Sequence, residues 1–529
     1  MNVLTSLTNL PFEQDNYLVG VDLGTTLAKA AVYDTTGRLL GESFQETQVH
    51  YPRPGVAEQD PLEFYQSAVA TIRAAVEQAG ISPHRVAALS VDSQAGGILA
   101  IDAHWQPVMH FDSPLDTRST PLKQRMMATA GKRIFELSGA SPTYGQKILW
   151  WKEENPQVWK QVYKFIQPAA YVAGLLAGLN GEQAYTEATF MCWSGLSDTA
   201  RMAWSEELCE IFDVPLSVLP RILSAHEIVG TLQSSAARDC GLPSGVPIAA
   251  GCSDAAATLL GASVIEPGLL FDISGTACIF GACINRYQAD VATQTLSCMN
   301  GVLPGQFYQL GIVLGGRTHD WFIHEFCAAE MKDNIGETKN VYAGMDARAA
   351  SLPPGSDGVL CVPHLGGRWN PPEPNVSGLW MGFGWGHHKE HLYRSILEAV
   401  AYEYASYLDH MRRTIPETKF EEVRVMGSGG RSRLWNEIKS NVLGLPYRKL
   451  ARGDLATWGS ALIAGHAVGI FTDLAAAAKA GADVTENVLP ENGTHQSYSQ
   501  YQLLYQEVLK RNQTCFNALA GLAKKRHSV

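Results

Sequence analysis

The sequence predicts an α/β protein with two large domains, each built on a mixed β-sheet. Its 529 residues exceed what a single hydrophobic core usually accommodates. The N-terminal part shows the element order βββαβ, and a pattern of apolar strand, aspartate and Gly-Thr turn occurs both there and just beyond the midpoint. Two such patterns, one opening each half, indicate a duplicated fold. Coincidence between short motifs is the alternative.

The N-terminal half begins with short strands joined by tight turns. The predicted elements are strands over residues 17–22, 27–33 and from Arg38, a helix from Pro61 to Gly80, and a strand over 86–91. Asp60 before a proline is typical of a helix start, and Gly80 of a helix end. The first three strands should therefore form an antiparallel meander, followed by a helix and a further strand of a mixed sheet.

The first turn, Asp22-Leu-Gly-Thr-Thr, has the composition of a phosphate-binding turn. Gly24 permits a tight bend, and the amides and hydroxyls of Thr25 and Thr26 can bind phosphate oxygens. Asp22, at the end of the strand, can hold a hydrated Mg²⁺ ion. A hairpin turn that happens to contain threonines is the alternative interpretation.

The stretch from Val246 to Ala262 puts a carboxylate at a strand-to-helix junction. An apolar run precedes Gly251, which lets another group come close, and Asp254 follows at the start of a small-residue helix. Because helix amides lie nearby, we expect Asp254 to be ionised and able to accept a proton from a hydroxyl. A helix N-cap is the alternative role.

Two loops carry polar groups suited to a small hydroxylated molecule. Gln94-Ala95-Gly96 lies between two predicted strands, and Asp116-Thr117-Arg118 follows farther along the chain. A turn and a surface ion pair would explain these residues equally well. The helix that begins at Lys147 contains two adjacent tryptophans, which we expect in the core.

Three further glycine turns occupy the second half. Their residues are Gly275, Thr276, Gly315, Gly316, Gly427, Gly429 and Gly430. The last turn is neither a G-x-G-x-x-G fingerprint nor a Walker loop, but a turn without side chains forms a flat slot for a purine ring. We expect the small-residue helix over 456–465 to close the other side of that slot.

The bulk properties exclude several classes of protein. A net charge of -11 argues against nucleic acid or an anionic membrane as the main partner. The N-terminal segment lacks a basic region followed by an apolar one, so we expect no secretory signal. Ten scattered cysteines without a CxxC pair indicate reduced, buried thiols, and we expect a cytoplasmic protein with no membrane span.

Taken in order, these motifs resemble the FGGY carbohydrate kinases, the family of xylulose, ribulose, gluconate and glycerol kinases. The resemblance rests on Asp22-Leu-Gly-Thr-Thr, Glu58-Gln59-Asp60-Pro61, Asp116-x-Arg118, Lys147-Ile-Leu-Trp150, Gly251-Cys-Ser-Asp254, Ser274-Gly-Thr276, Gly427-Ser-Gly-Gly430, and Gly378-Leu-Trp-Met-Gly382 with His391-Leu-Tyr-Arg-Ser-Ile-Leu-Glu398. It implies two ribonuclease-H-like domains of the actin, hexokinase and Hsp70 type with a central cleft. Residues 17–262 would carry the sugar site, the Mg²⁺ and phosphate turn and the catalytic aspartate, and residues 263–529 the nucleotide site.

The resemblance also implies roles for single residues. Asp254 matches the catalytic base, which also contacts the sugar, and Asp22 matches the acid that helps to hold Mg²⁺. The implied sugar contacts are Gln94, Ala95, Gly96, Asp116, Arg118 and Asp254. The implied ATP contacts are Gly24, Thr25, Thr26, Gly275, Thr276, Gly315, Gly316, Gly427, Gly429 and Gly430. The expected partners are a sugar or polyol, ATP, and a second copy of the chain in a homodimer.

One departure from the family pattern concerns the sugar. Xylulose kinases carry Gln-Met-His-Gly where this chain has Gln94-Ala95-Gly96-Gly97, and glycerol kinases carry Arg-Glu there. We expect ATP-dependent phosphorylation of a ketopentose such as xylulose or ribulose. The alternatives are another polyol or a sugar acid as acceptor, an actin/Hsp70-type ATPase, or a sugar-binding regulator without kinase activity.

Overall fold

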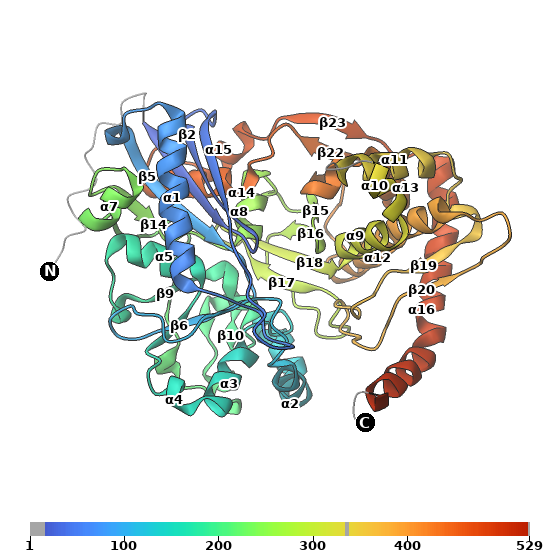
Figure 1. The fold of residues 1–529 in the computed structure, drawn as a ribbon, viewed down its shortest axis with the longest axis horizontal. Helices are drawn as coiled ribbons and strands as arrows, with labels where there is room; N and C mark the ends of the chain where they lie inside the picture. The colour runs from blue at the N-terminus through green and yellow to red at the C-terminus, as the bar shows by residue number, and fades with distance from the viewer. Residues whose placement is uncertain (1–15, 334–337, 527–529) are drawn as a thin grey trace. The chain divides into compact units, whose positions relative to one another are not determined.

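The computed structural model describes residues 16–333 and 338–526 (Figure 1). The segments 1–15, on which the expectation of no secretory signal rests, 334–337 and 527–529 lie outside the described residues. The chain divides into two compact units. The first unit comprises Met1–Ile265, Met299–Phe307 and Asp454–Ala482. The second comprises Glu266–Cys298, Tyr308–Gly453 and Asp483–Val529.

The first unit is built on a six-stranded mixed sheet of order β13-β14-β5-β1-β2-β3. Its strands are β1 (Tyr17–Leu23), β2 (Leu27–Asp34), β3 (Leu39–Glu46), β5 (Val86–Ser93), β13 (Ile228–Thr231) and β14 (Pro247–Ala249). The first three strands pair antiparallel, which confirms the predicted meander, whereas β5 runs parallel to both β1 and β14. The carboxyl ends of three parallel strands therefore meet at one edge of this sheet.

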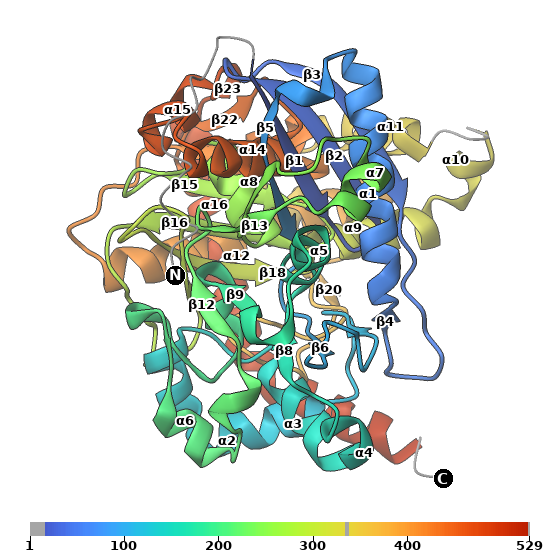
Figure 2. The ribbon, with the colours of Figure 1, turned by 90° about the vertical axis from the view of Figure 1, so that its left-hand side faces the viewer.

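Helices cover both faces of this sheet. Helix α1 (Pro61–Ala79) lies against β2 and β3, and α14 (Leu455–Ala467) lies against β1 and β5 (Figure 2). The predicted start of α1 is confirmed, because the carboxylate of Asp60 accepts a hydrogen bond from the amide of Leu62. Gly80 ends the helix with φ of 62°.

The small residues of α14 serve close packing in the first unit. A Cβ atom on Gly20 of β1 would lie 1.8 Å from the carbonyl oxygen of Thr457, and one on Gly459 would lie 2.0 Å from the carbonyl oxygen of Ala257. The helix is buried over almost its whole length. These small residues let the helix approach the sheet and α8 (Asp254–Gly261). The expectation that they cover a purine slot stays a prediction.

Smaller elements complete the first unit. They are β4 (Glu58–Gln59), β6 (Leu99–Ile101), β7 (Phe111–Asp112), β8 (Lys164–Ile166), β9 (Tyr185–Glu187), β10 (Ser197–Asp198), β11 (Ala203–Trp204), β12 (Arg221–Leu223), α2 (Thr120–Ser138), α3 (Gly145–Glu154), α4 (Pro156–Trp159), α5 (Pro168–Ala177), α6 (Glu206–Ile211), α7 (Ser234–Cys240) and α15 (Leu474–Ala480). Short strand pairs such as β4 with β7 and β6 with β8 flank the loops that carry Gln94 and Asp116.

The second unit repeats the strand arrangement of the first in a seven-stranded sheet of order β17-β18-β16-β15-β21-β22-β23. The strands are β15 (Leu270–Ser274), β16 (Cys278–Ile284), β17 (Ser297–Asn300), β18 (Phe307–Val313), β21 (Val423–Met426), β22 (Tyr447–Leu450) and β23 (Val484–Val488). Strand β15 pairs antiparallel with β16 and parallel with β21, as β1 pairs with β2 and β5. The repeated Gly-Thr motif thus occurs at the same place in both sheets.

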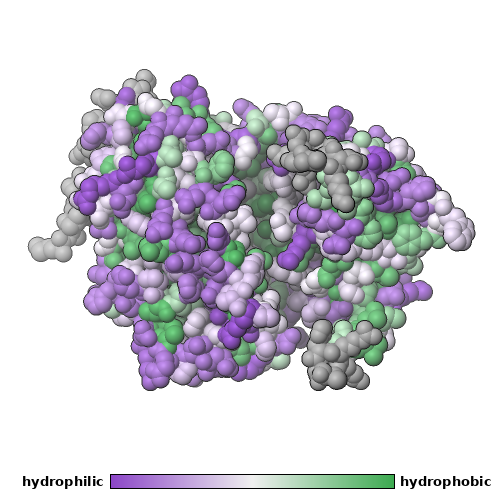
Figure 3. Space-filling view, in the orientation of Figure 1, coloured by the Kyte–Doolittle hydropathy of each residue, from purple (hydrophilic) through white to green (hydrophobic). Residues whose placement is uncertain are grey.

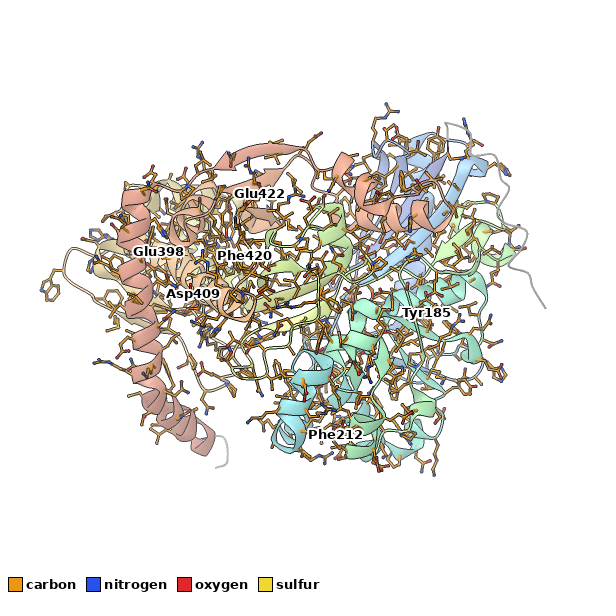
Figure 4. The ribbon with its side chains drawn as sticks, turned by 180° about the vertical axis from the view of Figure 1, so that it is seen from behind. Tyr185, Phe212, Glu398, Asp409, Phe420 and Glu422 are labelled. Carbon is orange, nitrogen blue, oxygen red and sulfur yellow. The ribbon has the colours of Figure 1, made fainter. Side chains whose placement is uncertain are left out.

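The remaining elements of the second unit are mostly helices. They are α9 (Gly315–Phe326), α10 (Ala328–Asp333), α11 (Thr338–Ala350), α12 (Lys389–Thr414), α13 (Arg433–Leu443), α16 (Asn492–Arg526) and the strand pair β19 (Leu360–Val362) and β20 (Leu379–Met381). Glu398 on α12 lies near α16, where its carboxylate accepts a hydrogen bond from the Tyr498 hydroxyl at 2.9 Å (Figure 4). Buried contacts of this kind attach the long terminal helix to the unit.

The structure shows how polar and apolar residues are distributed over the surface and which cysteines are buried. Hydrophilic and hydrophobic residues are interspersed over the visible face of the molecule (Figure 3). No helix in residues 16–333 and 338–526 combines the length and the apolar character that crossing a bilayer requires. Nine of the ten cysteines are buried, and Cys515 is exposed.

Candidate active site

Three aspartates lie near the carboxyl ends of the parallel strands in the first unit. Asp22 of β1 and Asp92 of β5 are register partners on adjacent parallel strands, and Asp254 is the first residue of α8, shortly after β14. Asp22 is 8% exposed and Asp92 is completely buried, whereas Asp254 is partly exposed. Edges of this kind, outside the carboxyl ends of parallel strands, are where α/β proteins bind ligands.

Asp254 does not cap the helix that it opens. The N-cap is Ser253, whose hydroxyl accepts a hydrogen bond from the amide of Ala256. The carboxylate of Asp254 instead accepts a hydrogen bond from the amide of Ala255 at 2.7 Å. The alternative role weighed for Asp254 thus belongs to its neighbour, and the side chain of Asp254 has no structural task at the cap.

The turn before Asp254 is fixed by a close backbone approach. Gly251 has φ of 75°, and a Cβ atom there would lie 1.8 Å from the carbonyl oxygen of Val91 on β5. Only glycine fits such a position. The amide of Ser253 also donates a hydrogen bond to the hydroxyl of Thr189 at 2.9 Å, so the residue before Asp254 is held from two sides.

Burial modifies the expectation that Asp254 is ionised. Removal from water raises the pKa of Asp254 to about 7, and the negative charge of Asp22 contributes in the same direction. The hydrogen bond from the amide of Ala255 opposes this shift but does not outweigh it. A carboxyl group with a pKa near neutrality can both accept and hold a proton at physiological pH.

The sequence analysis missed Asp92. Its carboxylate accepts a hydrogen bond from the hydroxyl of Ser460 on α14 at 2.6 Å, and burial together with repulsion from Asp22 raises its pKa well above the usual value. Its second oxygen, Oδ1, is buried and accepts no hydrogen bond from a backbone, hydroxyl, amide or ammonium group of the described residues; the side chain of Asp22 is its polar neighbour. The signal was present, because Asp92 follows an apolar strand as Asp22 does.

The first predicted phosphate turn is well defined. The amide of Gly24 donates a hydrogen bond to the carbonyl of Leu27, and the hydroxyl of Thr25 donates one to Oε1 of Gln94 at 2.9 Å. Thr26 is exposed, so its hydroxyl and amide are accessible to a ligand. Lys29, with Nζ 3.6 Å from a carboxylate oxygen of Asp22, adds a positive charge beside this turn.

Gln94 is attached to the turn Gly24-Thr25-Thr26. Its side chain is buried, accepts from Thr25 and donates to Oε1 of Gln59 at 2.8 Å. Ala95 is partly exposed, and Gly96 has φ of 82°. A Cβ atom on Gly96 would lie 3.2 Å from the hydroxyl oxygen of Thr143, so the space beside this glycine is bordered by another loop.

Asp116 and Arg118 do pair with each other, but not as a surface ion pair. Nε of Arg118 donates to Oδ2 of Asp116 at 2.8 Å, and Nη2 donates to Oδ1 of Asp112 at 2.8 Å. The side chain of Arg118 is only 10% exposed and its guanidinium carbon lies 4.8 Å from the ring centre of Trp150. The amide of Ala57 donates to the same oxygen of Asp116.

Further polar and aromatic groups around Arg118 were not anticipated. The indole of Trp151 donates to Oδ2 of Asp112 at 2.7 Å, and Nζ of the buried Lys147 donates to the carbonyl of Asp112. Burial raises the pKa of Asp112 to about 7 and lowers that of Lys147 to about 8. The two tryptophans are only partly buried, so the expectation that they belong to the core is wrong.

In the second unit the glycine turns lie against one another at the end of β15. A Cβ atom on Gly316 would lie 2.0 Å from the carbonyl oxygen of Gly275, and the amide of Arg317 donates to the carbonyl of Thr276. A Cβ atom on Gly427 would lie 2.7 Å from the carbonyl oxygen of Ser274. The first residues of α9 and the turn after β21 therefore join the Gly-Thr turn in one backbone surface.

The other predicted residues of this region complete that surface. Gly315 is the first residue of α9, a helix of twelve residues whose amino end carries a partial positive charge suited to an anion. Gly429 lies beside Ser274, where a Cβ atom would be 2.9 Å from the Cβ atom of that serine. Gly430 is buried against Val425 of β21.

A buried ion pair underlies the second Gly-Thr turn. Nζ of Lys439 on α13 donates to Oδ2 of Asp272 at 2.7 Å and to the hydroxyl of Ser274 at 2.6 Å, and both charged side chains are completely buried. Tyr404 donates a further hydrogen bond to Asp272, and the ammonium lies 3.9 Å from the ring centre of Trp435. Asp272, the counterpart of Asp22, is thus fully engaged within the protein.

Comparison with known proteins identifies the family. Residues 17–261 match the N-terminal domain and residues 272–468 the C-terminal domain of the FGGY family of carbohydrate kinases. Over 499 residues the chain is 26% identical to a xylulose kinase of Staphylococcus epidermidis, which covers 93% of this chain and 96% of that one. A glycerol kinase of Deinococcus radiodurans is 27% identical over 470 residues, covering 87% of this chain and 90% of that one.

Solved structures agree on the fold. A xylulose kinase from Rhodospirillum rubrum matches with a TM-score of 0.82 and 23% identity, covering 95% of this chain and all of that one. A gluconate kinase from Lactobacillus acidophilus matches with a TM-score of 0.85 and 20% identity, covering 96% and 100%. The predicted two-domain α/β fold and the predicted phosphorylation of a sugar hydroxyl with ATP are confirmed. This chain belongs to the FGGY family of carbohydrate kinases.

Proposed function

We propose that this kinase transfers the γ-phosphoryl group of ATP to a hydroxyl of a ketopentose, such as xylulose or ribulose, with Asp254 as the general base. The observation that carries the proposal is the position of Asp254. Its carboxyl group is partly exposed, lies at the carboxyl edge of the first sheet and has a pKa of about 7. Because Ser253 is the N-cap of α8, the side chain of Asp254 is not needed for capping. The similarity to xylulose kinases over 93% of the chain supports the choice of a ketopentose.

The reaction follows from that position. Asp254 accepts the proton of the sugar hydroxyl as the oxygen forms its bond to the γ-phosphorus. The bond between the γ-phosphorus and the bridging oxygen breaks, and its electron pair leaves with ADP. Because burial favours the protonated form of Asp254, the carboxyl group retains the proton until the product departs. The hydrogen bond from Ala255 holds the carboxylate in place during the transfer.

The first sheet has residues that fit a magnesium ion. Mg²⁺ prefers oxygen ligands and is usually bound by one or two carboxylates together with water and substrate phosphates. Asp22, near the carboxyl end of β1, supplies such oxygens. Within the described residues no group of three or more His, Cys, Asp or Glu side chains is arranged to hold a metal alone. When bound, the ion would neutralise charge on the phosphates.

We assign phosphate contacts to one turn within each unit. In the first unit we assign phosphate contacts to the turn Gly24-Thr25-Thr26, whose exposed Thr26 is accessible. In the second unit we assign them to Gly275, Thr276 and the amino end of α9 at Gly315 and Gly316. The purine ring is assigned to the turn Gly427–Gly430, where glycines leave a surface without side chains.

The acceptor is assigned to the cluster around Arg118. Its guanidinium is held between Asp116 and Asp112 and rests on Trp150, so several fixed polar groups and an aromatic face are available to a hydroxylated ligand. Gln94, Ala95 and Gly96 border the same region of the sheet. Because Arg118 already bonds two carboxylates, it is poorly suited to bind the carboxylate of a sugar acid, which favours a neutral sugar. The homodimer and the cytoplasmic location stay predictions from the sequence.

The experiment measures ADP release with xylulose, ribulose, glycerol and gluconate for the parent and for Asp254→Asn. We expect the highest kcat/KM with a ketopentose, and a decrease in kcat of about a hundredfold or more in Asp254→Asn with ATP binding retained. Glu210→Gln, which removes an exposed carboxylate on α6, is the matched control and should leave kcat unchanged. Parent-like turnover in folded Asp254→Asn would contradict its role, and preferred turnover of glycerol or gluconate would contradict the ketopentose.

A further inference from the structure

Asp92 is a buried carboxylate that packing alone does not explain. It lies near the carboxyl end of β5, completely buried, and Oδ1 accepts no hydrogen bond from a backbone, hydroxyl, amide or ammonium group of the described residues; the side chain of Asp22 is its polar neighbour. A buried carboxylate oxygen without such a donor is costly, and such atoms in native proteins call for an explanation such as an ion. Ser460 satisfies the other oxygen at 2.6 Å and thereby fixes the orientation of the side chain.

The register of the sheet directs that oxygen toward Asp22. Because Asp22 and Asp92 are partners on adjacent parallel strands, their side chains leave the same face of the sheet at neighbouring positions. The charges of Asp22 and Asp254 both act on Asp92. Lys29 is the nearby cation that pairs with Asp22, and it is half exposed and 3.6 Å away. Asp22 and Asp92 thus lie side by side, and the one ammonium group recorded beside them, that of Lys29, pairs with Asp22.

The geometry points to Asp92 as the second carboxylate of the divalent-cation site, acting with Asp22 on a Mg²⁺ ion that arrives with the nucleotide. This inference rests on the proposed use of Asp22 in the first unit. Asp92 offers Oδ1 to the cation or to one of its water ligands, while Ser460 holds Oδ2. Two hard oxygen ligands, completed by water and phosphate, match the way proteins bind Mg²⁺. Nothing in the assignment depends on which sugar accepts the phosphate.

The test measures cation binding directly. The electron paramagnetic resonance signal of free Mn²⁺ is recorded in the presence of ADP for the parent, Asp92→Asn, Ser460→Ala and Glu210→Gln. We expect Asp92→Asn to weaken Mn²⁺ binding by about 10- to 100-fold, as loss of a supporting ligand does. Ser460→Ala, which leaves the carboxylate but removes its anchor, should give a smaller loss of the same sign. Glu210→Gln should bind Mn²⁺ as the parent does.

Thermal unfolding without metal provides the second measurement. If Asp92 serves the cation, Asp92→Asn keeps an oxygen that can accept the hydrogen bond from Ser460 and should unfold at about the same temperature as the parent. A purely structural Asp92 would give the opposite pair of results, namely a lower unfolding temperature and unchanged Mn²⁺ affinity, and this would overturn the inference. If Asp92→Asn does not fold, parent-like Mn²⁺ binding by Ser460→Ala would overturn it. Turnover of any sugar tests the proposed function separately and has no bearing on this result.

Discussion

Replacing Lys439 by methionine removes the cation from a completely buried ion pair and keeps most of the volume of the side chain. The carboxylate of Asp272 would then remain buried with hydrogen bonds only from Ser274 and Tyr404. Breaking a buried pair from one side costs about 3–5 kcal/mol, because it leaves a charge without its partner. For a unit of this size, such a loss corresponds to a decrease in unfolding temperature of roughly 6–20 °C.

The assay compares calorimetric unfolding of Lys439→Met, of the double variant Asp272→Asn/Lys439→Met and of Lys29→Met. The double variant removes both charges and should recover much of the lost stability. Lys29 is the matched control, since it pairs with the counterpart Asp22 but is half exposed, and its loss should cost less than about 1 kcal/mol. A Lys439→Met protein as stable as the parent, or a double variant no better than the single one, would refute this reasoning.

Three other variants test separate parts of the first unit. Gly251→Ala should lower the unfolding temperature sharply in a circular-dichroism melt, because its Cβ atom would meet the carbonyl of Val91; an unchanged melt would show that the turn relaxes. Burial raises the pKa of Glu187 to about 8 from 4.5, so the stability that it contributes is present below pH 4.5 and is lost as the pH rises to 8. Glu187→Gln should therefore flatten the decrease in urea midpoint between pH 5 and pH 8, and a parallel decrease would contradict this. Arg118→Lys loses the planar contact with Trp150 and should raise KM for the sugar about tenfold but not KM for ATP, whereas equal changes would place Arg118 elsewhere.

The parts of the fold that were predictable depend on signals local in the sequence. The meander, the helix from Pro61 and the glycine turns are each marked by alternating apolar residues, an aspartate cap or a glycine within a few positions. The repeated Gly-Thr motif also predicts the shared strand arrangement of the two sheets. Asp254 was found because it follows a glycine turn directly.

The parts that were missed depend on contacts between distant segments. Asp92 acquires its environment from the register with Asp22 and from Ser460, which lies 368 positions away. Lys439 contacts Asp272, which lies 167 positions away in the sequence. No local sequence pattern predicts that this lysine is buried. The pKa of Asp254 likewise follows from burial in the finished structure, whereas the sequence shows only the helix amides that oppose the shift.

The place of α14 has a consequence for how the protein is made. The first unit ends at Ile265 in its main segment but lacks α14 until Asp454 and the residues after it have been synthesised. At about 5–20 residues per second, this interval lasts on the order of 10–40 s on the ribosome. During that time the face of β1 that α14 will cover is open, and Asp92 has not met Ser460. The nascent first unit therefore exposes apolar surface during this interval, and a ribosome stalled before Asp454 would carry a domain that cannot close its own core.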